Sequence, residues 1–240
     1  MKTKIKREAE NLGFKLGSLL SKGSSNAKTA KSDKVSGYRT MIQYLAPADL
    51  SGKNVCPYLS VGCKEACLNT AGRGAFDSTQ LGRLRRTALF WGNRKLYKKL
   101  LIAEIRAFAR SCERSGDTAC VRLNGTSDLS WEKLVPEVFT LFPDVIFYDY
   151  SKNPKRFGWV KKNYFITFSR SESNDKDALN VLQNGGNVAV VFKDLPETWN
   201  GYKVIDGDKT DLRFLDESNV VVGLTAKGKA RKDDSGFVVK

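Results

Sequence analysis

Short apolar runs alternate with longer amphipathic stretches along most of the chain, and this pattern predicts strands and helices that follow one another. Runs rich in β-branched and aromatic residues, bounded by turn-forming residues, indicate strands at 38–45, 119–123, 145–150, 164–168, 187–192, 202–205 and 219–223. Apolar residues that recur every three or four positions indicate helices at 79–114, 131–142, 155–162 and 175–184. The longest of these patterns is interrupted at Trp91-Gly92-Asn93, where it can divide into two helices.

Strands that alternate with helices pair in parallel through crossover connections. The predicted fold class is therefore α/β, and we expect a β/α barrel, TIM-like and possibly incomplete, as a single domain over residues 38–240. An open doubly wound sheet is the alternative. Residues 1–37 are basic and in their second half poor in apolar residues, which is typical of a flexible arm, with a short helix over 9–20 as an option.

Polar side chains gather directly after the predicted strands, at the carboxyl ends that form one face in β/α barrels and open α/β sheets. We expect one cleft there, with candidate substrate-binding residues from several loops: Asn124, Thr126, Ser127, Tyr148, Lys152, Ser169, Arg170, Glu172, Lys227 and Lys229. Loops of this kind are polar in any α/β protein, so a purely structural origin of the pattern stays open.

Three aspartates are candidates for catalysis. Asp128 closes the N-G-T-S-D turn after a strand, where it can act as acid, base or nucleophile, although a helix N-cap is an alternative that Ser130 could also fill. Asp206 and Asp208 alternate across Gly207, so on an extended chain they share one side and could divide acid and base roles.

Three of the five cysteines, Cys56, Cys63 and Cys67, are spaced C-x6-C-x3-C. If the last two lie on a helical turn, their sulfurs share a face. Three thiolates can hold zinc with a fourth ligand from elsewhere, or an iron–sulfur cluster with one iron left open. Small buried hydrophobes or a disulfide are the alternatives, but the odd cysteine count and the lack of a signal peptide favour a reducing compartment.

Composition points to a polyanionic partner. Lys and Arg number 41 against 26 Asp and Glu, a formal charge of +15, so nucleic acid is the expected partner, DNA more than RNA. Many of these cations fall in 79–114, as a phosphate-facing surface or an ordinary solvated face. The chain has no histidine, so general acid–base work falls to other side chains. No apolar run is long enough to span a membrane, and we expect a cytoplasmic protein, in the host cell if phage-encoded.

Several motifs carry a resemblance: V-C-P at 55–57 with the cysteine spacing, R-L-N-G-T-S-D at 122–128, F-Y-D-Y-S-K at 147–152 and F-S-R-S-E-S at 168–173. Over about 38–238 the chain resembles a family of phage gene products of unknown function. Its layout is also similar to tRNA-guanine transglycosylases and their phage relatives that insert 7-deazaguanine bases into DNA. That resemblance implies an aspartate nucleophile, matched by Asp128, and a second aspartate, matched by Asp206 or Asp208. The zinc site of those enzymes departs from this chain, because it includes a histidine and lies on the C-terminal side.

An early three-cysteine loop after the first strand also resembles radical S-adenosylmethionine enzymes, although their C-x3-C-x2-C spacing differs. The leading hypothesis is a metal-containing, phage-type enzyme that exchanges guanine in DNA for a 7-deazaguanine, a transglycosylase that takes its target base out of the stack. The alternatives are an iron–sulfur enzyme of radical or redox chemistry that acts on nucleic acid, and a non-catalytic nucleic-acid-binding accessory protein.

Overall fold

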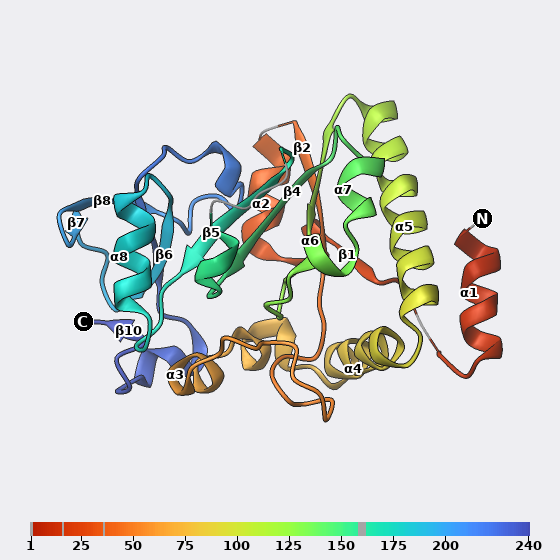
Figure 1. The fold of residues 1–240 in the computed structure, drawn as a ribbon, viewed down its shortest axis with the longest axis horizontal. Helices are drawn as coiled ribbons and strands as arrows, with labels where there is room; N and C mark the ends of the chain where they lie inside the picture. The colour runs from red at the N-terminus through yellow and green to blue at the C-terminus, as the bar shows by residue number, and fades with distance from the viewer. Residues whose placement is uncertain (1, 16, 36, 158–161) are drawn as a thin grey trace.

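One open, mostly parallel sheet organises the protein (Figure 1), whose computed structural model describes residues 2–15, 17–35, 37–157 and 162–240. The ten strands run in the order β1-β2-β3-β4-β5-β6-β9-β8-β7, with β10 paired to β6. Their bounds are β1 Leu20–Lys22, β2 Tyr38–Gln43, β3 Thr118–Arg122, β4 Ile146–Ser151, β5 Tyr164–Ser169, β6 Val188–Phe192, β7 Thr198–Trp199, β8 Tyr202–Asp206, β9 Val221–Thr225 and β10 Val238–Val239. The helices are α1 Lys2–Asn11, α2 Ala27–Val35, α3 Val61–Glu65, α4 Asp77–Gly92, α5 Arg94–Ser115, α6 Trp131–Leu134, α7 Glu137–Leu141 and α8 Asp175–Gln183.

The pairing confirms the α/β class but does not show a barrel. From β2 to β8 each neighbouring pair of strands is parallel, while β1–β2 and β7–β8 are antiparallel. To close the sheet, the free edge of β2 would have to pair with the last strand. That edge is occupied by β1, and the opposite edge by β7, so the sheet stays open at both ends.

The crossover helices lie on one face of the sheet, as right-handed connections between sequentially ordered parallel strands require. The long pattern predicted over 79–114 is indeed two helices, since α4 ends at Gly92 and Asn93 caps α5 by accepting a hydrogen bond from the Leu96 backbone N–H at 3.0 Å. The buried stripe of α5 includes Leu96, Leu100 and Ile105, and it packs on the side chains of Val121 and Phe147 from β3 and β4. Farther along the sheet α8 packs on β5, β6 and β9.

The opposite face is covered by α2 and the segment after β8, which contains the single-turn helix η5 (Arg213–Leu215). Leu212 and Phe214 pack there against Cys120 and Tyr148, the residues of β3 and β4 that point away from α5. Residues within the range 1–37, expected as a basic arm, supply α1, β1 and α2 in the described part of the chain, and β1 pairs with β2. The helix considered for 9–20 lies at Lys2–Asn11 instead.

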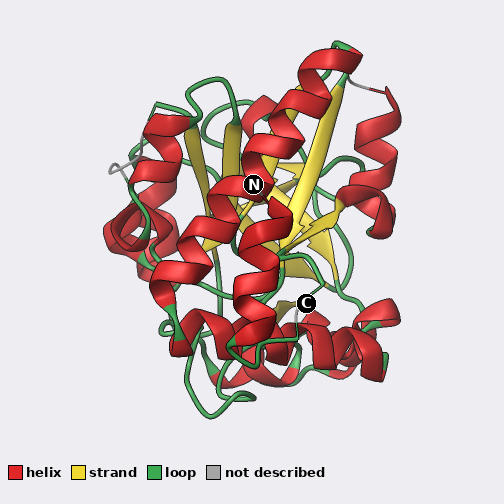
Figure 2. Ribbon diagram, turned by 90° about the vertical axis from the view of Figure 1, so that its right-hand side faces the viewer, coloured by secondary structure: helices red, strands yellow, loops and turns green. Residues whose placement is uncertain are grey.

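The carboxyl ends of the parallel strands all meet one layer of loops and short helices. This layer includes α3 and α4 and lies beneath the strand ends in Figures 1 and 2. None of the helices in the described ranges is long and apolar enough to cross a membrane.

Glu104 of α5 holds the first strand against the domain. It is 2% exposed, and its carboxylate accepts hydrogen bonds from the backbone N–H groups of Leu19 at 3.2 Å and Leu20 at 3.0 Å. Arg86 of α4 donates to the Ser18 carbonyl oxygen at 2.7 Å, so two helices fix this segment from both sides.

The substitution Glu104→Ala is expected to lower the free energy of unfolding by about 2–4 kcal/mol, because two buried backbone donors lose their acceptor. Urea denaturation measures this loss. Glu113→Ala, at an exposed position on the same helix, is the control and is expected to change stability by less than about 0.5 kcal/mol. Equal effects of the two substitutions would contradict the assigned role of Glu104.

Candidate functional site

The loop that follows β2 carries the three clustered cysteines and crosses beneath the carboxyl ends of β3, β4 and β5. Backbone contacts fasten it to the turn after β3: Gly125 N–H donates to the Gln43 carbonyl oxygen and Asp128 N–H to that of Val55, each at 2.9 Å. Thr126 adds a side-chain bond, from its hydroxyl to the Leu45 carbonyl oxygen at 2.6 Å. These bonds hold Cys56 next to the end of β3.

Glu172, in the turn after β5, fastens the second half of the loop. Its carboxylate accepts hydrogen bonds from the Ser60 hydroxyl at 2.7 Å and the Gly62 N–H at 2.8 Å. Ser60 in turn caps α3 by accepting from the Cys63 N–H at 3.2 Å. Glu172 was predicted to bind substrate; in the structure it fixes the start of the helix that carries Cys63.

The C-terminal segment closes the site from the side. Cys63 packs in a small cluster with Ala66, Ala230 and Phe237. A methyl group on Gly62 would lie only 2.1 Å from the Ser235 hydroxyl and 2.7 Å from Phe237, so this position has room only for glycine. Arg170 holds the segment in place by donating to the carbonyl oxygens of Gly236 and Phe237, and it also pairs with Asp175 at 2.6 Å.

Cys56, Cys63 and Cys67 are partly buried thiols that lie within electrostatic range of one another. Burial raises the pKa of Cys56 to about 11, and the neighbouring Cys67, Cys63 and Asp128 add to the effect. Burial also raises the pKa of Cys67. Cys56 and Cys67 therefore carry their protons at neutral pH in the absence of a bound cation.

Lys152, directly after β4, is the neighbour that all three thiols share. Its ammonium donates to the Ser169 hydroxyl at 3.1 Å and to Cys63, and it lies 5.9 Å from the centre of the Phe237 ring. Burial disfavours the charged ammonium, but Cys63 and Asp128 outweigh this effect and raise the pKa of Lys152. Lys152 and Ser169, both predicted for substrate binding, thus lie at the thiol cluster.

Asp128 also lies at the thiol cluster, but both of its oxygens are engaged. One accepts from the Ser151 hydroxyl at 2.6 Å and the other from the Lys152 N–H at 2.8 Å, and Arg156 lies 3.6 Å away. Neither Asp128 nor Ser130 caps α6 through its side chain. The observed contacts make Asp128 the residue that joins the turn after β3 to the end of β4.

The other predicted residues of this turn bind one another. The Asn124 side-chain oxygen accepts from the Ser127 hydroxyl, the Leu129 N–H and the Trp131 indole N–H, at 2.8–3.0 Å. Asp149, which the sequence analysis did not single out, is 1% exposed and accepts from the backbone N–H groups of Leu123 and Asn124. Burial raises the pKa of Asp149 to about 6. No sequence signal distinguishes it, because it lies inside a buried strand.

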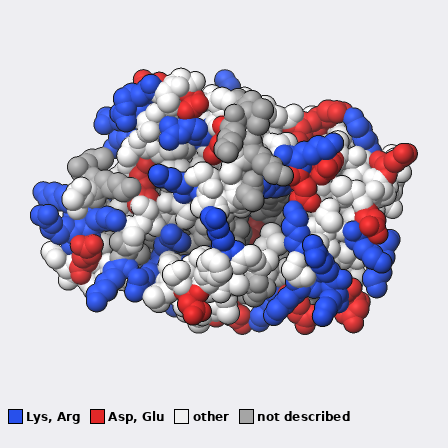
Figure 3. All heavy atoms as spheres, turned by 180° about the vertical axis from the view of Figure 1, so that it is seen from behind, with Lys and Arg blue, Asp and Glu red and all other residues white. Residues whose placement is uncertain are grey.

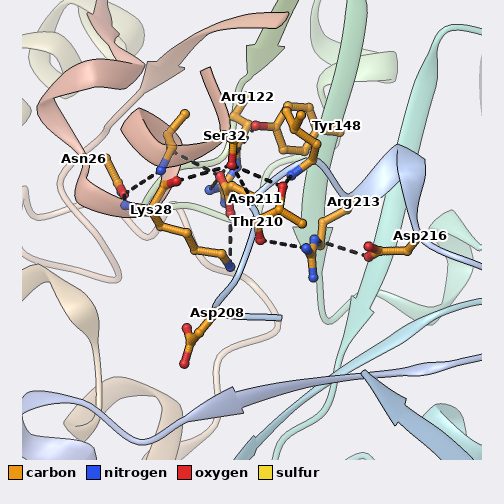
Figure 4. A network of polar contacts seen from close by, with 12 residues as sticks. Asn26, Lys28, Ser32, Arg122, Tyr148, Asp208, Thr210, Asp211, Arg213 and Asp216 are labelled. Atoms are coloured by element: carbon orange, nitrogen blue, oxygen red, sulfur yellow. Dashed lines mark hydrogen bonds and ion pairs between the residues drawn. The ribbon is translucent and has the colours of Figure 1, made fainter. Parts of the chain in front are cut away.

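Tyr148 belongs to a second polar group, on the face covered by α2 (Figure 4). Its centre is the buried Asp211, whose carboxylate pairs with Arg122 at 2.8 Å and Lys28 at 3.3 Å and lies 3.5 Å from the Tyr148 hydroxyl. Burial would raise the pKa of Asp211, but Arg122, Lys28 and Arg213 outweigh it and the pKa is lowered. Tyr148 therefore faces away from the thiols.

Asp206 and Asp208 lie near this second group rather than beside Asp128. Asp206 accepts from the Asp208 N–H at 2.9 Å, and the Asp208 carboxylate pairs with Lys227 at 2.6 Å and accepts from the Thr225 N–H at 3.0 Å. In Figure 4 the Asp208 carboxylate points away from Asp211. Lys229 is exposed on the single-turn helix η6 (Gly228–Lys232), which packs through Ala230 against the cysteine loop.

The thiol cluster is the strongest candidate site, although its sulfurs are not drawn together. Within the described residues, no group of three or more Cys, Asp or Glu side chains already has the arrangement of a metal site. The chemistry of the donors nevertheless suits a soft metal, because one loop supplies three thiols that lie within electrostatic range of one another.

Substitution of Asp128 and of Ser130 tests whether this turn serves to join β4 through Asp128 or to cap α6. Asp128→Ala is expected to lower the free energy of unfolding by about 1–3 kcal/mol, because the Lys152 N–H and the Ser151 hydroxyl lose their acceptor. Ser130→Ala is expected to change stability by less than about 0.5 kcal/mol, because Ser130 makes no side-chain cap. Both are measured by urea denaturation, and a larger effect at Ser130 would restore the helix-cap interpretation.

Comparison with known proteins gave one family. A family model described as Gene product 88 matches residues 18–240. The searches of curated proteins and of solved structures gave no match.

Proposed function

The chain belongs to the Gene product 88 family, in agreement with its resemblance to phage gene products, and we propose that it is an iron–sulfur enzyme whose cluster is held by Cys56, Cys63 and Cys67. The observation that carries the proposal is that the three thiols share Lys152 as a charged neighbour, at the carboxyl ends of β4 and β5. Ligands of open α/β sheets bind at this end of the strands.

The number of sulfur donors favours a cluster over a structural zinc. Structural zinc takes four protein ligands, usually cysteine and histidine, and this chain has no histidine. The two remaining cysteines are elsewhere: Cys112 is buried on α5 and Cys120 packs against Tyr148 on the opposite face of the sheet. Three thiolates and an open fourth position suit an iron–sulfur cluster that presents one iron to a small molecule.

The loop is built to hold thiolates in one place. Glu172 and Ser60 fix the start of α3, and the bonds of the turn after β3 fix the chain around Cys56. When bound, such a cluster supplies electron transfer or radical chemistry. Lys152 and Ser169 stand beside the thiols as a donor pair that can hold an anionic or carbonyl group of a substrate.

The position of the loop also supports this class of chemistry. The cysteines follow β2, the first parallel strand of the sheet, as the sequence resemblance to radical S-adenosylmethionine enzymes implies. The cysteine spacing departs from that family, so the proposal is limited to an iron–sulfur centre of radical or redox type.

The contacts give less support to guanine exchange. That reaction needs one free carboxylate as nucleophile and a second for proton transfer. Both oxygens of Asp128 are engaged, and Asp206 and Asp208 have partners in another group. Incubation with DNA and a 7-deazaguanine base, followed by mass spectrometry of the nucleosides, would reveal such an exchange if it occurs.

Anaerobic purification, with reconstitution by iron and sulfide, tests the proposal. We expect a brown protein that contains iron and acid-labile sulfide, and we expect Cys56→Ala, Cys63→Ala and Cys67→Ala each to lose most of both, because three thiolates are the minimum for the cluster. The measurements are metal analysis, sulfide analysis and visible absorbance.

The matched controls are Cys112→Ala and Cys120→Ala, which remove a thiol outside the loop and are expected to keep the iron. A colourless protein that binds zinc through the same three cysteines would contradict the cluster. Loss of iron in the control variants, with the fold intact by circular dichroism, would contradict the assignment of the ligands.

A further inference from the structure

Four basic side chains and two aromatic rings lie near the point where the N-terminal segment meets α4. We call this group the α4 surface and define it by Phe14, Lys15, Lys53, Arg85, Trp91 and Arg94. These residues are far apart in the sequence, and the fold brings them together.

Trp91 holds two of the cations. The Lys53 ammonium lies 5.3 Å from the centre of its ring and the Arg94 guanidinium 4.9 Å, and Arg94 also lies 4.3 Å from the Phe90 ring. Such contacts attract a cation to the face of a ring and limit its motion. Lys53 and Arg94 are therefore positioned before any ligand arrives.

The other two cations line a hollow between the N-terminal segment and α4. This hollow has a volume of about 480 Å³ and is lined by Glu10, Lys15, Gly17 and Arg85. The Phe14 ring packs on the end of α4, since a methyl group on Gly92 would lie 3.0 Å from it. Phe14 thus lies against Gly92, the residue that follows Trp91 in the chain.

The four cations have no carboxylate at ion-pair distance within the described residues, unlike Lys98, which pairs with Glu137, and Lys203, which pairs with Glu217. Unpaired cations that share one surface add their fields. The view from behind shows Lys and Arg with few acidic side chains among them at the left end of the molecule, the end that carries α1 and α5 in Figure 1, and Lys and Arg mixed with Asp and Glu at the right end (Figure 3).

We propose that the α4 surface binds the phosphate backbone of single-stranded nucleic acid and directs the strand towards the thiol site. A regular polyanion matches four separated, unpaired cations, and the formal charge of +15 favours its approach. The surface reaches the cysteine loop through Lys53, which lies three positions before Cys56.

The choice of a single strand rests on the proposed function. The thiols are partly buried beneath the strand ends, and a base in a duplex must leave its stack before it can reach a site of that kind. An unpaired strand avoids this energetic penalty. The atom of the strand that reacts at the thiol site would then lie on a base or a sugar, while the α4 surface holds the phosphates.

The test compares two variants of equal net charge. One neutralises the surface with Lys15→Gln, Lys53→Gln, Arg85→Gln and Arg94→Gln; the other neutralises exposed cations elsewhere with Arg110→Gln, Arg114→Gln, Lys176→Gln and Lys193→Gln. Fluorescence anisotropy with a labelled single-stranded oligonucleotide, over a series of salt concentrations, gives the affinity. Each lost phosphate contact lowers the slope of log affinity against log salt by about 0.7, so the surface variant is expected to lose about 2.8 and the control nearly nothing.

Further measurements separate the possible outcomes. Equal weakening of both variants, or equally tight binding of polyaspartate, would overturn the α4 surface as a nucleic-acid site, and tighter binding of duplex than of single strand would overturn the choice of strand. Iron analysis of the same preparations keeps the two proposals apart. Oligonucleotide binding by a protein that takes up no iron would support the α4 surface and contradict the iron–sulfur cluster. Iron uptake without oligonucleotide binding would support the cluster and contradict the α4 surface.

Discussion

Carboxylates that accept hydrogen bonds from backbone N–H groups connect the segments of this structure where the hydrogen-bonded pairing of strands ends. Glu104 accepts from the start of β1, Asp149 from the end of β3, Asp128 from the end of β4 and Glu172 from the start of α3. A loop that crosses the ends of parallel strands cannot continue their ladder, so its N–H groups need another acceptor. A carboxylate offers two oxygens and bonds of charge-assisted strength, which lets one side chain join two loops.

This use of acidic residues explains which parts of the site the sequence could predict. A strand followed by polar residues predicts a site at the carboxyl ends of the strands, and Cys56, Cys63 and Lys152 lie within electrostatic range of one another there. An aspartate after a strand has the same sequence context whether it reacts with a substrate or accepts backbone N–H groups. Asp128 could therefore be located from the sequence, but its role depends on contacts with Ser151 and Lys152 that form only in the folded chain.

The fold could be predicted for most strands, and the reasons for the misses are physical. Seven predicted strands correspond to β2, β3, β4, β5, β6, β8 and β9, because buried parallel strands have continuous apolar runs. Whether the sheet closes into a barrel depends on what pairs with its two outermost parallel strands. The strands that pair there, β1 and β7, are too short to be recognised from periodicity. Alternate residues of β4 face opposite sides, so Ser151 contacts Asp128 whereas Tyr148 lies beside Asp211 on the other face of the sheet.

Contact of Phe237 and Ser235 with Gly62 has a consequence for how the protein acquires its site. Most of the polypeptide separates these residues, so the wall beside Cys63 can form only after nearly all intervening strands have paired. Contacts of such high sequence separation form slowly during folding. The thiols therefore spend the early part of folding exposed to oxidants, and a reducing environment matters more to the nascent chain than to the finished protein.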